Sequence, residues 1–487
     1  MSAQQNISFD VAVIGAGPAG LAAAVAAAER GARVAVLDAG AQPGGQFWRH
    51  RPETVFPEPD GHGHHGWKTY LDLRARFEAA RTRGTLHYLP NTQVWMVERE
   101  DAGRFVLRLT PATGTQLVQA TVRADKLVSC TGGYDRQLPL PGWDLPGVMA
   151  AGGIQAFIKA NGALPGKRFV VAGTGPFLLP VAANIAEAGG KVVAVCEAAS
   201  LANWLPHLGA ASGVPGKALE GAEYAGIFAK HQIRYRTRTV VTQVLGETGA
   251  SSVRIAKVDA DGAVIAGTEQ LLEDVDVVGF GWGFTPQVEL AVALGAETRI
   301  DADGSLVCVV DGQQATNIAG LYLAGEATGV GGAVLAVAEG LVAGAAAATG
   351  ETPSAGANRQ IKRHRRFAGA MHAAHPVPEK WDELLTDETI VCRCEEVNHG
   401  SIVAAREDLG ATDARTMKSF TRTGMGWCQG KVCGFAVSCL SSGDSAGKQS
   451  NGTQASHASL SAVAKRPVVA PLTLGEISTL DSRPPSA

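Results

Sequence analysis

The sequence predicts an α/β protein with two units of the form strand, glycine turn, helix, strand, followed by a small α-rich domain that carries cysteines. Three observations lead to this prediction. The first unit occupies residues 9–38, a related pattern returns at residues 168–197, and four cysteines gather between residues 392 and 433. A chain of 487 residues has room for two to four domains. We therefore expect two nucleotide-type folds and a separate C-terminal domain.

The first unit is the clearest pattern in the chain. Two apolar runs, Phe9–Ile14 and Val34–Leu37, flank the alanine-rich segment Pro18–Arg30, and Asp38 follows the second run. The turn has the form G-x-G-x-x-G, made by Gly15, Gly17 and Gly20. Such glycines permit the tight turn, the approach of a pyrophosphate and close helix–strand packing, and an acid at the next strand end can bind a ribose hydroxyl. The unit therefore predicts a Rossmann-like dinucleotide-binding fold.

Further motifs make the cofactor more specific. Pro43-Gly44-Gly45-Gln46 follows the first unit, Thr131-Gly132 ends a later apolar run, and Gly325-Glu326 ends another. Together these motifs resemble the flavoproteins with two dinucleotide-binding folds, a group that includes thioredoxin reductase and ferredoxin reductases. The resemblance implies FAD in the first fold and a helix near Gly332 whose positive N-terminal end stabilises reduced flavin. The residues it implies for FAD are Gly15, Gly17, Pro18, Ala19, Gly20, Asp38, Gly45, Gln46, Thr131, Gly132, Gly325, Glu326 and Ala333.

The second unit departs from the first at one glycine. Gly173 and Gly175 match the first two glycines, but Leu178 stands where the third would be, and a bulky residue there should shift the turn or the helix. In the resembling flavoproteins this fold binds NAD(P)H. Glu197 could bind a ribose hydroxyl, and no Arg follows it to hold a 2′-phosphate. The sequence therefore leaves open NAD(P), with NAD favoured, another adenine nucleotide, or a scaffold role.

The C-terminal cysteines form C-x-C followed by C-x4-C. They are Cys392, Cys394, Cys428 and Cys433. Thiolates suit zinc or iron–sulfur clusters, and zinc sites favour wider spacing in the first pair. The pattern resembles the bacterioferritin-associated-ferredoxin-like (BFD-like) domain, which implies a [2Fe–2S] cluster, while zinc and free thiols remain alternatives. Cys130, Cys196 and Cys308 are expected in the core, and Cys439 on a following helix without a ligand role.

These motifs predict a domain plan. A histidine tract at residues 62–65 reads as a loop, with a metal site as the alternative. The basic run Ile361–Phe367 predicts a solvated helix face, with a docking surface for an acidic partner as the alternative. Leu86–Glu98 is expected as one strand of a meander with a hairpin turn at Thr113-Gly114. The expected domains are 1–143 with 285–351 for FAD, 144–284 for the inserted NAD(P)-binding-like fold, 352–386 as linker helix, 387–441 for the BFD-like domain, and 442–487 as a disordered tail with a short extended end.

Composition excludes several classes of function. The net charge of −3 argues against nucleic acid or an anionic membrane as partner. The first ten residues lack the features of a signal peptide, and no apolar run reaches the roughly 18 residues that a membrane span requires. Eight cysteines in a chain of this length do not indicate a disulfide scaffold. We therefore expect a cytoplasmic protein.

The order of the motifs resembles one family along most of the chain. It is the FAD-dependent alpha subunit of heteromeric dye-linked opine, hydroxyproline and proline dehydrogenases. The resemblance implies a partner beta subunit of amino-acid-oxidase type that oxidises the amine, with a small ferredoxin-like subunit and interfacial FMN as further possibilities. This chain would then relay electrons, and no catalytic side chain is assigned. The alternatives are a self-contained NAD(P)H-dependent flavin reductase and a non-catalytic assembly subunit.

Overall fold

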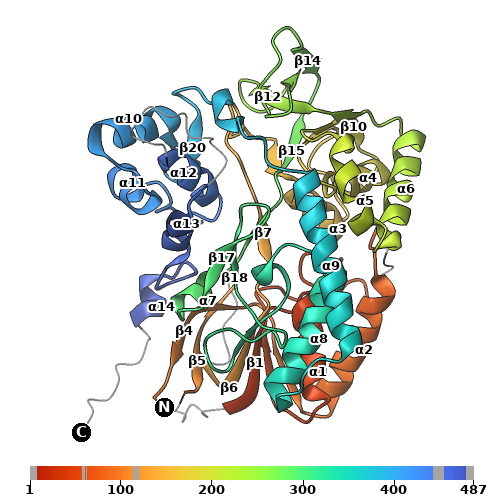
Figure 1. Ribbon diagram of the computed structural model, residues 1–487, viewed down its shortest axis with the longest axis vertical. Helices are drawn as coiled ribbons and strands as arrows, with labels where there is room; N and C mark the ends of the chain where they lie inside the picture. Colours follow the sequence, from red (N-terminus) through yellow and green to blue (C-terminus); the bar gives the residue numbers. More distant parts are fainter. Residues whose placement is uncertain are drawn as a thin grey trace.

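A computed structural model describes residues 8–57, 61, 63–101, 103–112, 120–442 and 455–478. Figure 1 shows three parts: a sheet with helices at the bottom, a second sheet with helices at the upper right, and a small helical unit at the upper left. Within the described residues, no helix is both long and apolar enough to cross a membrane.

The first sheet has seven strands in the order β3-β2-β1-β6-β5-β4, with β19 beside β6. Its strands are β1 (Ser8–Ile14), β2 (Val34–Leu37), β3 (Leu86–Leu89), β4 (Thr92–Arg99), β5 (Phe105–Pro111), β6 (Thr121–Ser129) and β19 (Leu321–Leu323). The neighbours of β1 run parallel to it, whereas β4, β5 and β6 form an antiparallel meander. The strands around β1 are buried, as parallel strands covered by helices require.

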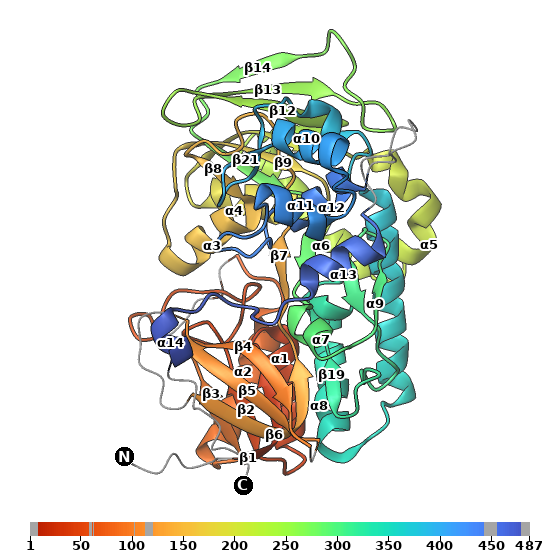
Figure 2. The ribbon, with the colours of Figure 1, turned by 90° about the vertical axis from the view of Figure 1, so that its left-hand side faces the viewer.

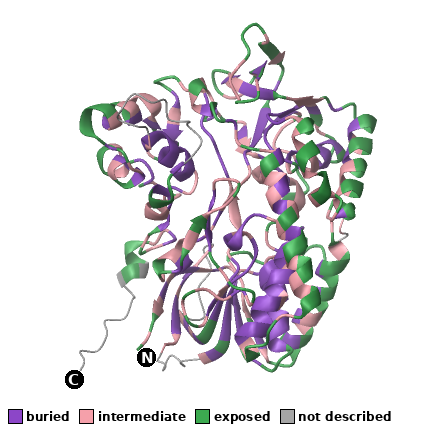
Figure 3. Cartoon of the chain, in the orientation of Figure 1, coloured by how far each residue is buried: buried purple, intermediate pink, exposed green. Residues whose placement is uncertain are grey.

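Two helices cover one face of this sheet and contact each other closely. They are α1 (Pro18–Ala28) and α8 (Ala333–Thr349), which Figure 3 shows almost entirely buried; α2 (Trp67–Thr82) packs beside α1. A Cβ added at Gly340 would lie 2.1 Å from the Ala19 carbonyl oxygen, and one at Gly344 would lie 2.1 Å from that of Ala23. Small residues on α8 therefore allow the two backbones to touch.

The second sheet lies between β6 and β19 in the sequence. Its order is β11-β10-β9-β15-β8. These strands are β8 (Val148–Ala150), β9 (Arg168–Gly173), β10 (Lys191–Glu197), β11 (Tyr235–Thr237) and β15 (Val277–Gly281). Its helices are α3 (Ala151–Asn161), α4 (Leu178–Glu187) and α6 (Pro215–Lys230), with η1 (Leu201–His207) and α5 (Leu208–Ala211) between α4 and α6. A three-stranded antiparallel sheet follows, made by β12 (Thr239–Leu245), β13 (Ser252–Lys257) and β14 (Gln270–Glu273).

A pair of short antiparallel strands connects the two main sheets. β7 (Gly133–Asp135) carries the chain out of the first sheet, and β16 (Phe284–Pro286) carries it back. After β16 come α7 (Glu289–Ala293), β17 (Thr298–Ile300), β18 (Leu306–Cys308) and η2 (Gly325–Thr328). The two crossings therefore lie side by side between the sheets.

The helical unit at the upper left holds the cysteines. Helix α9 (Ala355–Ala374), the long helix that runs alongside α8 in Figures 1 and 2, leads towards it. Its elements are η3 (Trp381–Leu384), β20 (Ile390–Cys392), β21 (Val397–Asn398), α10 (His399–Leu409), α11 (Ala414–Thr421), α12 (Gly434–Ser441) and α13 (His457–Ala464), whereas the last helix, α14 (Leu474–Ser478), lies beside β4 of the first sheet. Cys439 lies buried on α12, and Cys130, Cys196 and Cys308 are also buried, as predicted.

Two local predictions differ from the structure. The expected strand Leu86–Glu98 is divided into β3 and β4 at Pro90 and Asn91, because Pro90 has no N–H to donate and Asn91 has a φ of +50°. The expected disordered tail contains helices α13 and α14; Ser456 caps α13, and Leu460 and Ala464 are buried on it. The predicted turn Thr113-Gly114 and residues 443–454 of the tail lie outside the described residues.

Candidate functional site

A single large cavity runs between the three parts of the molecule. Its volume is about 2050 Å³. The glycine turn after β1, the connecting strand β7, the turn after β9 and the N-terminal end of α8 all line it. The loop before α12 lines it as well, through Lys431 and Val432. One cavity therefore reaches both nucleotide-type folds and the cysteine unit.

The first glycine turn borders the cavity with backbone that carries no side chains. A Cβ at Gly45 would lie 2.7 Å from the Gly17 Cα, so the two loops meet only because Gly45 lacks a side chain. Gly17 caps α1 without a side-chain hydrogen bond, and Pro18 begins the helix. The free N–H groups at this helix end therefore face the cavity, as a pyrophosphate requires.

Asp38 lies at the end of β2 and lines the cavity. Its carboxylate accepts hydrogen bonds from the backbone N–H groups of Ala16 and, at 2.5 Å, Gly40. Burial raises the pKa of Asp38, although these two hydrogen bonds act in the opposite direction. The acid therefore fixes the glycine turn and borders the space where a ribose would lie.

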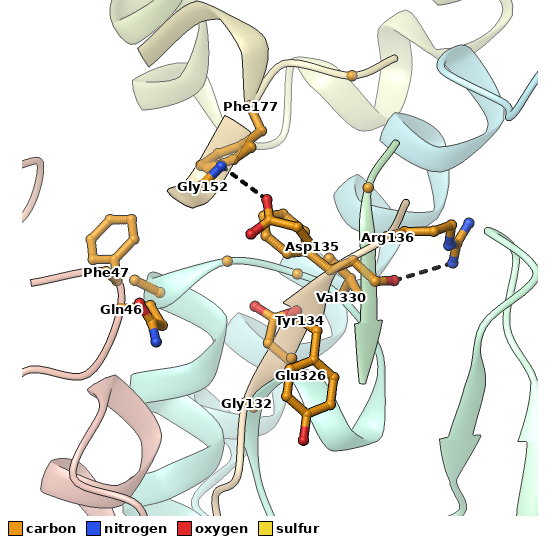
Figure 4. Close-up of a pocket in the computed structure, with 18 of the residues that line it drawn as sticks. Gln46, Phe47, Gly132, Tyr134, Asp135, Arg136, Gly152, Phe177, Glu326 and Val330 are labelled. Carbon is orange, nitrogen blue, oxygen red and sulfur yellow. Dashed lines mark hydrogen bonds between the residues drawn. The ribbon is translucent and has the colours of Figure 1, made fainter. Parts of the chain in front are cut away.

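Glu326 is the acid that follows β19. It is half-buried and lines the cavity, and its Oε2 atom is buried with no hydrogen-bond partner among the described residues. Burial raises the pKa of Glu326 to about 7, assisted by Glu339 and opposed by Arg365. Figure 4 shows Glu326 beside Gly132 and Tyr134, below Asp135. An unpartnered buried acceptor at this place fits a flavin side chain with hydroxyl groups.

Two partners of this region were not predicted from the sequence. Glu339, on α8, accepts from the Gly325 N–H at 3.0 Å and pairs with Arg365 at 2.6 Å. Arg365 also donates to the Gly329 carbonyl at 2.7 Å and to the Thr328 hydroxyl. The basic run was expected to be solvated, and this expectation is wrong for Arg365, because a buried acid across the helix pair attracts it. The one sequence signal for such an ion pair was Glu339, a single acid within an otherwise apolar helix.

The other predicted flavin residues gather around the same cavity, with one exception. Thr131 donates to the Gln287 carbonyl at 2.6 Å, and Gln46 accepts from Arg49 at 2.7 Å. The predicted residues that line the cavity are Gly15, Gly17, Pro18, Ala19, Asp38, Gly45, Gln46, Thr131, Gly132, Gly325, Glu326 and Ala333. Gly20 lies behind the turn, where an added Cβ would be 1.8 Å from the Gly15 carbonyl oxygen, so its role is packing.

The second glycine turn is built differently. Helix α4 begins five residues after Gly173, whereas α1 begins three residues after Gly15, which is the shifted turn that Leu178 predicts. Glu197 is fully buried and does not line the cavity. It accepts hydrogen bonds from the N–H groups of Gly175 and Ala199, both at 2.9 Å. Unlike Asp38, this acid is turned away from the cavity and is held by the protein.

The four clustered cysteines form two pairs. The thiol of Cys433 hydrogen-bonds Cys392 and lowers the pKa of Cys392 to about 6, and backbone N–H groups, including that of Gly424, act in the same direction. Cys394 and Cys428 form the second pair, and both affect the titration of Cys433 electrostatically. Over the described part of the chain, no group of three or more His, Cys, Asp or Glu side chains is arranged to hold a metal ion directly. The sulfurs are neighbours, with N–H groups aimed at them as a cluster requires.

Two further residues lie between the flavin side and the cysteines. Tyr134, on β7, lines the cavity, and the Nζ of Lys431 lies 5.4 Å from the centre of its ring. Burial raises the pKa of Tyr134, and Glu289 and Cys428 add to the shift. Sequence reasoning missed both residues, because nothing local in the sequence shows that β7 lies beside the cysteine loop.

Two histidines of the tract at residues 62–65 form hydrogen bonds with other residues of this chain. His64 Nε2 lies 2.5 Å from the Arg49 carbonyl oxygen, and His65 Nε2 lies 2.6 Å from the Tyr224 hydroxyl. His62 lies outside the described residues. Two of the histidines therefore connect the loop before α2 to its surroundings.

Comparison with known proteins shows which families these parts of the chain match. Residues 9–340 match the pyridine nucleotide-disulphide oxidoreductase family, and residues 390–439 match the BFD-like [2Fe–2S] binding domain. The chain is 32% identical to the A subunit of opine oxidase from Agrobacterium tumefaciens (strain Ach5), over 88% of this chain and 84% of the relative. It is 28% identical to the HcnB subunit of hydrogen cyanide synthase from Pseudomonas protegens, over 88% of this chain and 90% of the relative.

A solved structure has the same fold. L-proline dehydrogenase from P. horikoshii aligns with a TM-score of 0.66 and 17% identity, over 97% of this chain and 79% of that chain. The cavity fits FAD, the cysteine set fits a [2Fe–2S] cluster, and these are the cofactors that the two matched families imply. The chain therefore belongs to the pyridine nucleotide-disulphide oxidoreductase family, as an FAD-dependent, iron–sulfur oxidoreductase related to the A subunit of opine oxidase.

Proposed function

We propose that this chain relays electrons within a multi-subunit amine or opine dehydrogenase. A partner of amino-acid-oxidase type would oxidise the amine, and this chain would carry the electrons through FAD and the cluster to an acceptor. The relatives support a subunit role, because they are named as the A subunit of opine oxidase, the HcnB subunit of hydrogen cyanide synthase and the alpha subunit of sarcosine oxidase. The sarcosine oxidase relative of Corynebacterium sp. (strain P-1) is matched over only 27% of its length, so it supports the relation and no more.

One observation carries the proposal: the cavity of the first fold extends to the cysteine loop. Lys431 and Val432, just before Cys433, line the same cavity as Gly17 and Glu326. Tyr134 contacts the Lys431 ammonium and responds to the charge of Cys428. The flavin site and the loop that carries Cys428 and Cys433 therefore border one cavity.

The residues of this chain would have distinct roles. The N–H groups at the start of α1 would hold the pyrophosphate, and Glu326 would accept from the flavin side chain. Helix α8 begins at Ala333 without a side-chain cap, so its positive end would favour negative charge on the flavin ring. Bound FAD supplies the ability to exchange electrons in pairs with one partner and singly with another.

We infer that Cys392, Cys394, Cys428 and Cys433 hold the cluster. They come from the end of β20 and from the loop before α12, whereas Cys439 is buried on α12 itself. Cys439 is thus a matched control: it is a cysteine of the same unit with no expected ligand role.

Photoreduction of the reconstituted chain tests the relay. The protein is loaded with FAD, iron and sulfide, reduced anaerobically in small steps with light and deazaflavin, and followed by absorbance and EPR. We expect a reduced-cluster EPR signal to grow as the flavin exchanges electrons with it. Cys394→Ser should abolish cluster absorption and leave flavin bound, and Cys439→Ser should leave both unchanged. Loss of the cluster in Cys439→Ser, or its survival in Cys394→Ser, would contradict the ligand set.

The rival function is a self-contained NAD(P)H-dependent reductase. The turn at Thr174 and Gly175 lines the cavity, which favours some nucleotide there, but Glu197 does not reach it. Anaerobic mixing with NADH decides between the two: prompt bleaching of the flavin supports the reductase, whereas unchanged flavin absorbance supports the relay. A non-catalytic assembly role predicts a colourless protein after the same reconstitution.

A further inference from the structure

The cysteine unit exposes one of its four clustered sulfurs to solvent. Cys394 is exposed and Cys428 is half-buried, whereas Cys392 and Cys433 are buried. The loop between Cys428 and Cys433 faces the large cavity, which Lys431 and Val432 line. A cluster in this loop would therefore have an inner side that faces the flavin and an outer side at Cys394.

Large apolar side chains are exposed on the same unit. Trp427 is 77% exposed, Phe420 53% and Met425 41%. Met425 and Trp427 flank Gly426, where an added Cβ would lie 2.1 Å from the Cβ of Cys394. An indole this exposed is unfavourable on a free surface, and aromatic residues, Met and Arg are enriched at interfaces. None of these three apolar residues lines the cavity, so the flavin site does not explain them.

Residues 413–427, which contain these apolar side chains, hold three cations and one acid, although Glu395 and Glu396 follow Cys394 and offset part of this charge. Arg422 pairs with Glu395 at 2.9 Å and is itself largely exposed. Arg415 and Lys418 lie on α11, one helical turn apart. Burial lowers the pKa of Lys418, and repulsion from Arg466 and Arg415 lowers it further, so these cations lie near one another. An acidic partner would relieve this repulsion.

We propose that an acidic one-electron carrier protein docks on this face, defined by Phe420, Met425 and Trp427 with Arg415, Lys418 and Arg422, and receives the electron at Cys394. The inference rests on the proposed relay function. Redox partners form small, short-lived interfaces of less than about 1,200 Å², so a few exposed aromatic side chains and a positive rim suffice. Charge of opposite sign speeds such encounters and makes them sensitive to salt.

Electron delivery to an acidic probe tests the docking face. The full chain, loaded with FAD and cluster, is photoreduced and mixed in a stopped-flow instrument with cytochrome b5, which is acidic. We expect a second-order rate that falls as salt is raised. Trp427→Ala should lower that rate about tenfold. Phe420→Ser, further from the cysteines, and Arg415→Glu, in the first turn of α11 where an acid is tolerated, should also lower it.

The controls separate charge from position. Arg359→Glu makes the same charge change on exposed α9, away from the cysteine unit, and should leave the rate unchanged. Cytochrome c, which is basic, should react more slowly at low salt and faster at high salt. Unchanged cytochrome b5 rates in Trp427→Ala, Phe420→Ser and Arg415→Glu would overturn the docking face. The flavin and cluster spectra are recorded first, because a cluster that never becomes reduced contradicts the relay itself, whereas normal reduction with unchanged carrier rates contradicts the docking alone.

Discussion

At the scale of single residues, Glu326 shows how a binding site is prepared at the expense of stability. Its Oε2 atom is buried, and burial raises the pKa of the carboxyl from 4.5 to about 7. Below pH 4.5 both folded and unfolded states hold the proton. Between pH 4.5 and 7 only the folded state holds it, so stability falls as the pH rises through this window and is flat above it. The loss amounts to about 3 kcal/mol.

Glu326→Gln should remove this pH dependence. In FAD-free protein we expect the wild-type free energy of unfolding to fall relative to the variant between pH 4.5 and 7, by about 3 kcal/mol in total. Urea unfolding of the two proteins at several pH values measures the difference. Parallel curves would show that Glu326 ionises normally in the folded chain.

Gly45 makes a steric prediction about flavin binding. An added Cβ would meet the Gly17 Cα at 2.7 Å, and the φ of +60° disfavours any other residue. Gly45→Ala should therefore move the loop into the pyrophosphate space and weaken FAD binding at least about tenfold, equivalent to roughly 1.4 kcal/mol. Gly84→Ala is the control: Gly84 has a φ of +76° but nothing within 4 Å, so it adds backbone strain without crowding. Flavin titration should show equal affinity in this control and in the wild type.

At the scale of elements, the contact between α1 and α8 depends on two glycines. Ala in place of Gly within a helix normally stabilises the helix by up to about 1 kcal/mol. At Gly344, however, the new Cβ would lie 2.1 Å from the Ala23 carbonyl oxygen, and both helices are buried. Gly344→Ala should therefore destabilise the protein by about 1–3 kcal/mol. Gly369→Ala, on α9 with open space around it, should be neutral or stabilising in the same thermal unfolding experiment; equal shifts in the two variants would contradict the crowding.

The elements that sequence could predict are those whose signals are local. The glycine turn after β1 and the acid Asp38 lie within 24 residues, and their spacing predicts a dinucleotide-binding unit, although the hydrogen bond from the Ala16 N–H to Asp38 appears only in the structure. The second turn could be predicted only in part: Leu178 signals the departure, but the inward position of Glu197 depends on Thr174, Gly175 and Ala199 around it. Local pattern predicts which element forms, whereas the orientation of a side chain depends on packing.

At the scale of the whole molecule, the unpredicted contacts all join distant segments. Arg365 reaches Glu339 across two helices, and Lys431 reaches Tyr134 across nearly three hundred residues. Each charge or ring is ordinary in the sequence, and only the fold brings its partner close. The same holds for Arg136, whose guanidinium lies 4.2 Å from the ring centre of Phe435 in the cysteine unit. The contacts that join the flavin-binding part to the cysteine unit therefore could not be predicted from the spacing of residues in the sequence.

A substitution at Trp143 tests whether these contacts stabilise the folded protein. Its side chain is buried, its indole N–H donates to the Ile390 carbonyl at 2.5 Å, and Arg393 lies over its ring. Trp143→Phe removes the donor and leaves a carbonyl without its partner, so we expect a loss of about 1–2 kcal/mol and earlier unfolding of the cysteine unit. Trp282 is the matched control, because it is similarly buried but its N–H has no hydrogen-bond partner in the described part of the chain, and Trp282→Phe should lower stability less. Calorimetry with cluster absorbance as a second probe measures both. If the two variants lower stability equally, the hydrogen bond to Ile390 does not stabilise the contact between the flavin-binding part and the cysteine unit. That contact would then depend on Arg136 and the apolar side chains around Phe435.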